Sequence, residues 1–193
     1  IIQQTLLLGV GMSVGTFREK NRFLELSSID EHHHGTFRIV IGKSLAYLMI
    51  YMLMGTYIAC FVPHLFSLVQ LADSWTLASF MLPYLLACIF FAMTASAVVR
   101  NRETCMLLFV FTSLPLLFIS GISWPGASVP TFWKVLSWVF PSTFGINGFV
   151  HINTMGAALT DVSSEIRALW IQTGFYFVTT CLVYRWQIVR SLK

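Results

Sequence analysis

The tripeptide Gly42-Lys43-Ser44 has residue types and an order that suggest chemistry. A phosphate-binding loop ends in Gly-Lys-Ser/Thr and has a further glycine five positions earlier, so that successive backbone N–H groups point at the phosphates. In this chain that earlier position is Phe37, and the nearest upstream glycine is Gly35. The residues after Ser44 form a long uncharged apolar run instead of the start of an α/β domain. The pattern therefore predicts a basic residue at the mouth of a membrane helix and no nucleotide site in this chain.

Histidines and nearby polar residues are the other candidates for a metal or catalytic site. The three consecutive histidines at 32–34 would point about 100° apart on a helix, so they cannot converge on one ion. A surface cluster that titrates near pH ~6.5 is the better interpretation. His151, Asn153 and Asp161 have no spacing typical of a nucleophile and its base. We therefore expect no catalytic residue, no metal site and no bound cofactor in this chain.

The composition indicates that lipid is the solvent for much of the chain. Of 193 residues, 56% are hydrophobic, 15% are aromatic and 10% are charged, whereas an average soluble domain has about 25% charged residues. A core of this size cannot hide so much apolar surface. The cysteines lie in or beside apolar runs without metal-ligand spacing, so we expect buried thiols and no structural disulfide. They are Cys60, Cys88, Cys105 and Cys181.

Five apolar runs approach the ~20 residues that a helix needs to cross a bilayer. They are residues 1–17, 45–63, 75–99, 104–122 and 168–184. The connections on one side, together with the C-terminal tail, carry ten of the twelve Lys and Arg residues. The positive-inside rule places that side in the cytoplasm, with the N-terminus outside and the C-terminus inside. The predicted fold class is an all-α, polytopic membrane helix bundle.

Small residues indicate where the predicted spans pack against one another. Gly11 and Gly15 are four residues apart, as are Ala92 and Ser96, and this spacing is favoured at helix contacts in membranes. The middle of each span lacks Asp, Glu, Lys and Arg, although ion-coupled carriers use such residues as relays. Any transport would therefore draw its energy from elsewhere.

The segment 120–156 is apolar, yet it is interrupted by prolines and glycines. Residues 131–140 predict a short helix of about 15 Å, half a bilayer, and Pro141 would separate it from a second short helix at 142–152. We predict a re-entrant helical hairpin that enters from the outer face and returns. One alternative is an ordinary outer loop with interfacial helices. Another is a full span at 131–150, which would reduce the split of basic residues to eight against four.

Seven residues of this region resemble, in order and spacing, the segment after the fifth transmembrane helix of type-2 ATP-binding-cassette (ABC) exporter permeases. They are Ser120, Gly121, Pro125, Pro130, Trp133, Pro141 and Thr143. The resemblance covers the whole chain as one permease domain, residues 1–193, from the family's second helix to its sixth. The family's first helix, and any extracytoplasmic domain after it, would then precede Ile1. The sequence starts without a methionine or a basic leader, so we expect a fragment that begins inside a helix.

The resemblance also implies partners and a location. A separate ABC ATPase subunit would bind ATP and Mg²⁺, and this chain would hold no cofactor. A second permease half, identical or different, would complete a substrate path in contact with membrane lipid, and no nucleic acid would be involved. The location would be the bacterial inner membrane, with the C-terminus in the cytoplasm and transport directed outward. An intramembrane enzyme using His151 and Asn153, or a non-transporting scaffold, are the alternatives.

The predicted cytoplasmic loop 18–44 combines charged and apolar residues. Its amphipathic stretch lies along the membrane surface or a partner, and Ser28 and Glu31 have capping-box spacing for a short helix that Gly35 would end. A solvated helix anchored by arginines is the alternative. The resemblance implies that this loop transmits movement from the ATPase. The residues we assign to coupling are Phe23, Leu24, Glu25, Leu26 and Glu31.

Overall fold

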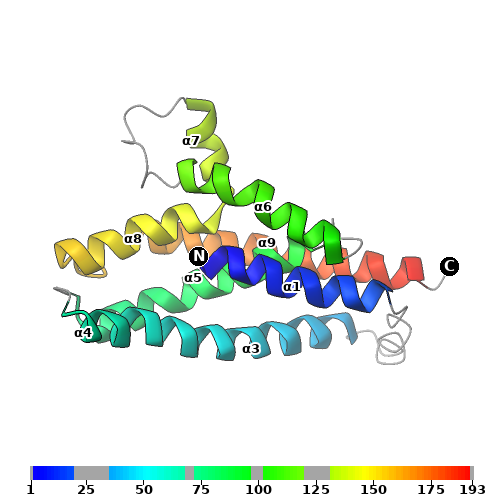
Figure 1. Ribbon diagram of the computed structural model, residues 1–193, viewed down its shortest axis with the longest axis horizontal. Coiled ribbons are helices and arrows are strands. Elements are labelled where there is room, and N and C mark those ends of the chain that lie inside the picture. The colour runs from blue at the N-terminus through cyan, green and yellow to red at the C-terminus, as the bar shows by residue number, and fades with distance from the viewer. Residues whose placement is uncertain (1, 20–34, 68–71, 97–101, 120–130, 192–193) are drawn as a thin grey trace.

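A computed structural model describes residues 2–19, 35–67, 72–96, 102–119 and 131–191. Every regular element in these ranges is a helix, and the helices form one elongated bundle (Figure 1). The elements are α1 (Ile2–Glu19), α3 (Gly35–Thr56), the π-helix η1 (Tyr57–Phe61), α4 (Val62–Leu65), α5 (Ser74–Ala95), α6 (Arg102–Ile119), α7 (Thr131–Ser137), α8 (Pro141–Met155) and α9 (Ser163–Ser191).

The described parts of the five predicted spans are almost entirely helical, which confirms the all-α membrane bundle. Three segments in the described ranges are long and apolar enough by themselves to cross a membrane: Thr36–Leu65, Trp75–Ala95 and Ser163–Trp186. The remaining two, α1 and α6, have 18 residues each, which is about 27 Å of helix. α6 contains a shorter apolar stretch, Glu103–Leu116.

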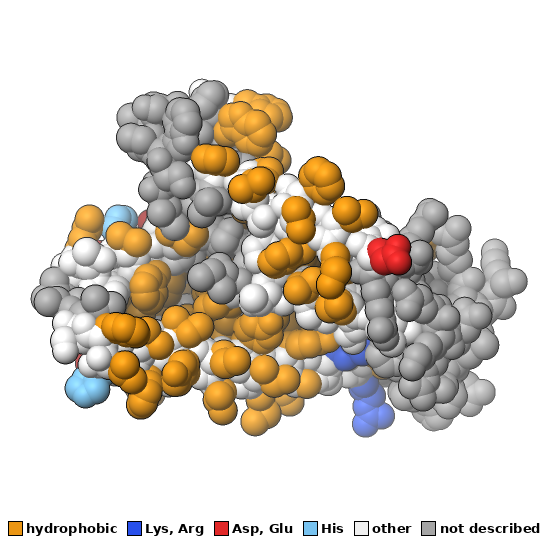
Figure 2. All heavy atoms as spheres, in the orientation of Figure 1, with side chains coloured by type: hydrophobic (Ala, Val, Ile, Leu, Met, Phe, Trp, Pro, Cys, Tyr) orange, Lys and Arg blue, Asp and Glu red, His pale blue; other side chains and the backbone are white. Residues whose placement is uncertain are grey.

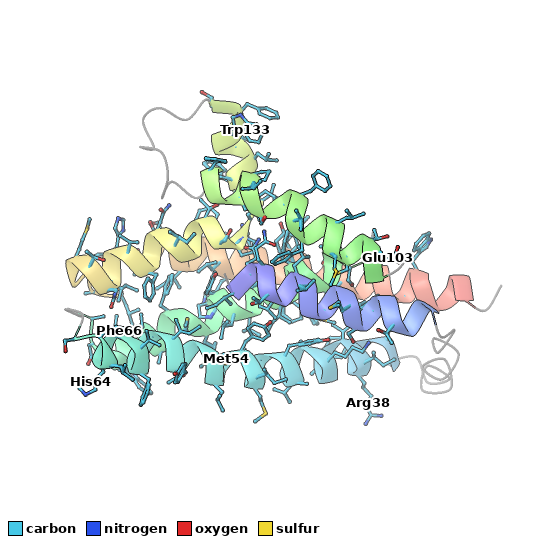
Figure 3. The ribbon with its side chains drawn as sticks, viewed as in Figure 1. Arg38, Met54, His64, Phe66, Glu103 and Trp133 are labelled. Atoms are coloured by element: carbon cyan, nitrogen blue, oxygen red, sulfur yellow. The ribbon has the colours of Figure 1, made fainter. Side chains whose placement is uncertain are left out.

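The elongated bundle has two ends, at which different connections lie. At the Arg38 end, on the right of Figure 1, α1 ends, α3 and α6 begin and α9 ends. At the Asp73 end, on the left, α4 leads to α5 and α8 leads to α9. Arg38 and Glu103 lie toward one end and His64 and Phe66 lie at the other (Figure 3). Along the chain α1, α3, α5, α6 and α9 thus alternate in direction (Figure 1), and the Arg38 end is the one that the charge pattern assigns to the cytoplasm.

α3 begins earlier than the sequence predicted. We expected residues 18–44 to form a loop and Gly35 to end a short helix, but Gly35 is the first residue of α3. The reason is apolar burial in the first turns, because Ile39 is 8% exposed and Val40 is fully buried in the larger hydrophobic cluster. That packing extends the helix through residues 35–44. The predicted loop therefore gives way to helix before residue 44, whereas the start of the membrane span at residue 45 stays a prediction.

α5 is the central helix of the bundle. It packs against α1, α3, α8 and α9, and 61% of its apolar window is buried, compared with 12% for α3 and 22% for α9. The remaining surface of α3 is apolar and exposed, and Figure 2 shows hydrophobic side chains spread along α3 and α6 on this face. Such a large apolar surface is stable against lipid but not against water.

Candidate functional site

Lys43 and Ser44 lie inside α3 and not in a phosphate-binding loop. The Ser44 hydroxyl donates to the carbonyl oxygen of Ile41 at 2.9 Å. The Lys43 Nζ lies 5.5 Å from the centroid of the Tyr184 ring on α9, a cation–π geometry. Because backbone N–H groups inside a helix bond to the helix's own carbonyls, they cannot cradle a phosphate here. The membrane-helix interpretation of Gly42-Lys43-Ser44 fits the structure.

The residues that an intramembrane enzyme would use are not brought together. His151 and Asn153 are two positions apart on α8, and residues with that spacing do not share a helix face. Asp161 lies in the turn before α9, where its Oδ2 accepts the N–H of Ala158 at 3.1 Å. Within the described ranges no three His, Cys, Asp or Glu side chains group as a metal site. The histidine run 32–34 lies outside those ranges.

The junction between α7 and α8, which we call the hinge (residues 138–142), is the most unusual local structure. Pro141 has no N–H, and its ring is incompatible with a continuous helix, so α7 ends at Ser137 and α8 begins at Pro141. In a continuous helix the carbonyl of Trp138 would accept the N–H of Ser142 and that of Val139 would accept the next N–H. The break leaves these backbone groups to find other partners.

Three side chains from two other helices supply those partners. Gln172 Nε2 donates to the carbonyl oxygen of Trp138 at 2.6 Å, and the Tyr176 hydroxyl donates to that of Val139 at 2.6 Å. The N–H of Ser142 donates to Gln3 Oε1 at 2.7 Å. α1 therefore contributes one hydrogen bond to the hinge and α9 contributes two. Sequence reasoning missed Gln3, Gln172 and Tyr176, and the only signal for the two glutamines was an amide within an apolar run.

The hinge lies near the middle of the bundle's length, and the side chains of Trp138 and Val139 are exposed, at 67% and 46%. Gln172 and Tyr176 are about 14 and 20 Å along α9 from its first residue, at 1.5 Å per residue, which is near half of a ~30 Å hydrocarbon layer. Phe140 packs edge-on against Phe91 of α5 with ring centroids 5.7 Å apart, and Phe91 in turn meets Tyr176 at 5.3 Å. Aromatic packing and hydrogen bonds thus fix the same point of the chain.

α8 runs from the hinge back to the Asp73 end. Gly145 faces Tyr84 and Gly148 faces Phe80 on α5, so closely that a Cβ at either glycine would overlap the ring. Farther along α8, Ile152 is buried in the second hydrophobic cluster, which also contains Val162. The helix ends at Gly156, whose φ of 64° suits glycine. The predicted break at Pro141 and the second short helix are both observed.

Comparison with known proteins identifies the family of the chain. A sequence model of the family described as "ABC-2 family transporter protein" matches residues 5–182. The chain belongs to the ABC-2 transporter family. No curated protein and no solved structure matches it. The resemblance seen in the sequence is therefore confirmed, and the chain is a multi-pass membrane permease component of an ABC transporter.

Three of the seven residues predicted for the hairpin of this ABC-2 permease lie in the described ranges. Trp133 is an exposed residue of α7, at the top of Figure 3, and α7 contacts α6. Pro141 is buried at the start of α8, and Thr143 is partly buried in the first turn of α8. Four predicted residues lie outside the described ranges: Ser120, Gly121, Pro125 and Pro130.

The predicted packing residues of the permease are all buried. Gly11 and Gly15 lie on α1, which packs against α5 and α6. Ala92 and Ser96 are fully buried at the end of α5, and the Ser96 hydroxyl donates to the carbonyl oxygen of Met93 at 2.6 Å. Of the cysteines, Cys88, Cys105 and Cys181 are free thiols. The coupling residues lie outside the described ranges and stay a prediction: Phe23, Leu24, Glu25, Leu26 and Glu31.

Proposed function

We propose that this permease is the membrane subunit of an ABC exporter and moves its substrate outward. A separate ATPase subunit binds ATP and Mg²⁺ and supplies the energy, and a second permease half completes the substrate path. The observation that carries this proposal is the family match over residues 5–182. The helices add support, because α5 has no charged residue between Ser74 and Ala95 and so offers no ion relay.

The Arg38 end is the proposed docking side for the ATPase. The connection 20–34 joins the end of α1 to the start of α3 at this end (Figure 1). Its apolar Phe23 and Leu26 lie among charged and polar residues of the sequence. The basic residues favour a cytoplasmic location for this end. An ATPase that closes on ATP would push this connection, and the push would tilt α1 and α3.

The experiment begins with the tagged permease purified from its native membranes. We expect an ATP-hydrolysing chain to co-purify. In inside-out membrane vesicles, export appears as ATP-dependent accumulation of substrate, so a panel of dyes and fluorescent lipid analogues is the probe. The matched control is the same complex with a hydrolysis-deficient ATPase partner, which should accumulate nothing.

Two results would contradict the proposal. Accumulation that follows a proton gradient in the absence of ATP would show a different energy source. Chemical turnover by the purified permease alone, without an ATPase, would favour the intramembrane enzyme, in which His151 and Asn153 were the candidate residues.

A further inference from the structure

The side chains that hydrogen-bond the hinge lie on two helices, α1 and α9, which lead to different parts of the chain. Gln3 lies in the first turn of α1, whose other end leads to the connection 20–34. Gln172 and Tyr176 lie on α9, which packs along α5 and α8. The hinge is therefore held from two sides. A displacement of α1 relative to α9 must change at least one of the three bonds.

Each of the two glutamines uses only one of its two polar side-chain atoms at the hinge. Gln3 is 2% exposed and its Oε1 accepts the Ser142 N–H, but its Nε2 has no partner among the described residues. In Gln172 the two atoms have the opposite roles. Its Nε2 is bonded, whereas its buried Oε1 has no partner among the residues that the structure describes. The orientation of each amide is fixed, since exchanging its oxygen and nitrogen would oppose two donors or two acceptors.

A buried donor and a buried acceptor without partners raise the free energy of the arrangement that contains them. A movement of the hinge that opened the site to water or to other polar groups would let both amides complete their hydrogen bonds. The hinge is thus well held in its present position, and such a movement would offset the bonds that it breaks. An element with two such arrangements is the physical basis of a switch.

We propose that Gln3, Gln172 and Tyr176 form a latch on the α7–α8 hinge, and that the latch opens when ATP binding to the partner displaces α1 relative to α9. We call these three side chains the hinge latch. The inference rests on the proposed ATP-driven function. It adds to that function a specific route by which movement at the Arg38 end reaches α8, whose far end lies at the Asp73 end of the bundle.

Hydrogen exchange in the purified permease–ATPase complex tests the latch directly. In the parent complex without nucleotide, the amides of residues 142–145 should be protected. Gln3→Leu and Tyr176→Phe should each speed their exchange by about tenfold or more. Trapping the parent with ATP and vanadate should produce a similar increase. Tyr57→Phe is the matched control, because the Tyr57 ring is exposed and stacks on Phe61 away from the hinge.

Two exchange results would overturn the proposal. Unchanged protection in both variants would show that these side chains do not hold the hinge. Faster exchange in the variants, but none in the ATP-trapped parent, would show a static support that never opens.

A crosslink provides an independent test, in which transport before crosslinking and after cleavage controls for the folding of the variant. Gln3→Cys and Ser142→Cys are introduced together into a permease whose four native cysteines are alanine, and a cleavable bifunctional thiol reagent joins them. The crosslinked complex should retain ATP hydrolysis and lose at least about nine-tenths of its transport, which cleavage of the reagent restores. Transport at the uncrosslinked rate would overturn the latch. Absence of ATP-driven transport in the parent itself would instead contradict the proposed function.

Discussion

Lys43 lies in the third turn of α3, with its Nζ 5.5 Å from the centroid of the Tyr184 ring. A cation–π contact of this kind contributes about 0.5–2 kcal/mol, depending on how far it is desolvated. Lys43→Gln should therefore lower thermal stability slightly and leave ATP hydrolysis by the assembled complex within a few-fold of the parent. Lys43→Arg, which keeps the charge, is the control. A loss of hydrolysis of a thousandfold, about 4 kcal/mol in the barrier, with assembly intact would contradict this role.

Gln3 and Gln172 show which functional residues a sequence reveals and which it does not. Both appear in the sequence as amides within apolar stretches, and such polar residues usually find a specific partner in a membrane. Their partners here are backbone groups of residues 142 and 138, far along the chain. No residue pattern encodes a bond to a backbone atom, because every residue has the same groups. Only the fold brings these atoms within hydrogen-bond distance.

At the scale of helices, the sequence predicted boundaries correctly only where their cause is local, and not at every such place. Pro141 stops α7 and starts α8 because proline cannot continue a helix, and this was predicted correctly. The helix α3 begins earlier than predicted. The reason is that Val40 is buried against residues of α1, α5 and α9, which a local sequence pattern does not contain. The π-helix Tyr57–Phe61 was also missed. Its cause is local, since Pro63 displaces the carbonyl of the residue four positions earlier, Ala59.

The contact between α8 and α5 depends on two glycines. A Cβ at Gly145 would overlap the Tyr84 ring, and one at Gly148 would overlap the Phe80 ring. Gly148→Ala should therefore destabilise the permease by about 1–3 kcal/mol, as overpacking does, measured as a lower Tm in detergent. Gly174→Ala on α9 is the matched control, because nothing lies within 4 Å of its Cβ position. That change should be neutral or should stabilise the helix by about 0.5–1 kcal/mol. Equal Tm values for the two variants would show that α8 is not packed closely on α5.

For the whole molecule, the direction of the bundle in the membrane is a prediction from charge. Thr154→Cys, near the end of α8, should react with an impermeant thiol reagent added outside intact cells, in a permease without its native cysteines. Arg38→Cys should react only after the membrane is opened. Both positions are exposed. Arg38 is near the start of α3 and Thr154 near the end of α8, and these helix ends lie at opposite ends of the bundle (Figure 1). The reverse pattern of labelling would mean that the basic residues face outward and that the proposed docking side is on the wrong side of the membrane.

The attachment of the ATPase is the remaining property of the whole complex, and it depends on the connection 20–34. Phe23 and Leu26 are three residues apart, so on a helix they share a face. Burial of each in a groove of the partner contributes about 1.5–3 kcal/mol at most, and a few such anchors commonly dominate an interface. Phe23→Asp combined with Leu26→Asp should release the ATPase on purification but leave the membrane yield unchanged, because the connection is predicted to lie outside the bilayer.

The matched control for this double variant is Ser27→Asp with Ser28→Asp. It adds the same negative charge to the same connection while keeping both apolar side chains, and Asp at position 28 preserves the predicted helix cap. We expect this control to retain the ATPase. If both double variants lose it, charge and not apolar burial governs the attachment. If neither loses it and coupled transport persists, Phe23 and Leu26 rest on the lipid surface, and the ATPase must push the permease through another part of the Arg38 end.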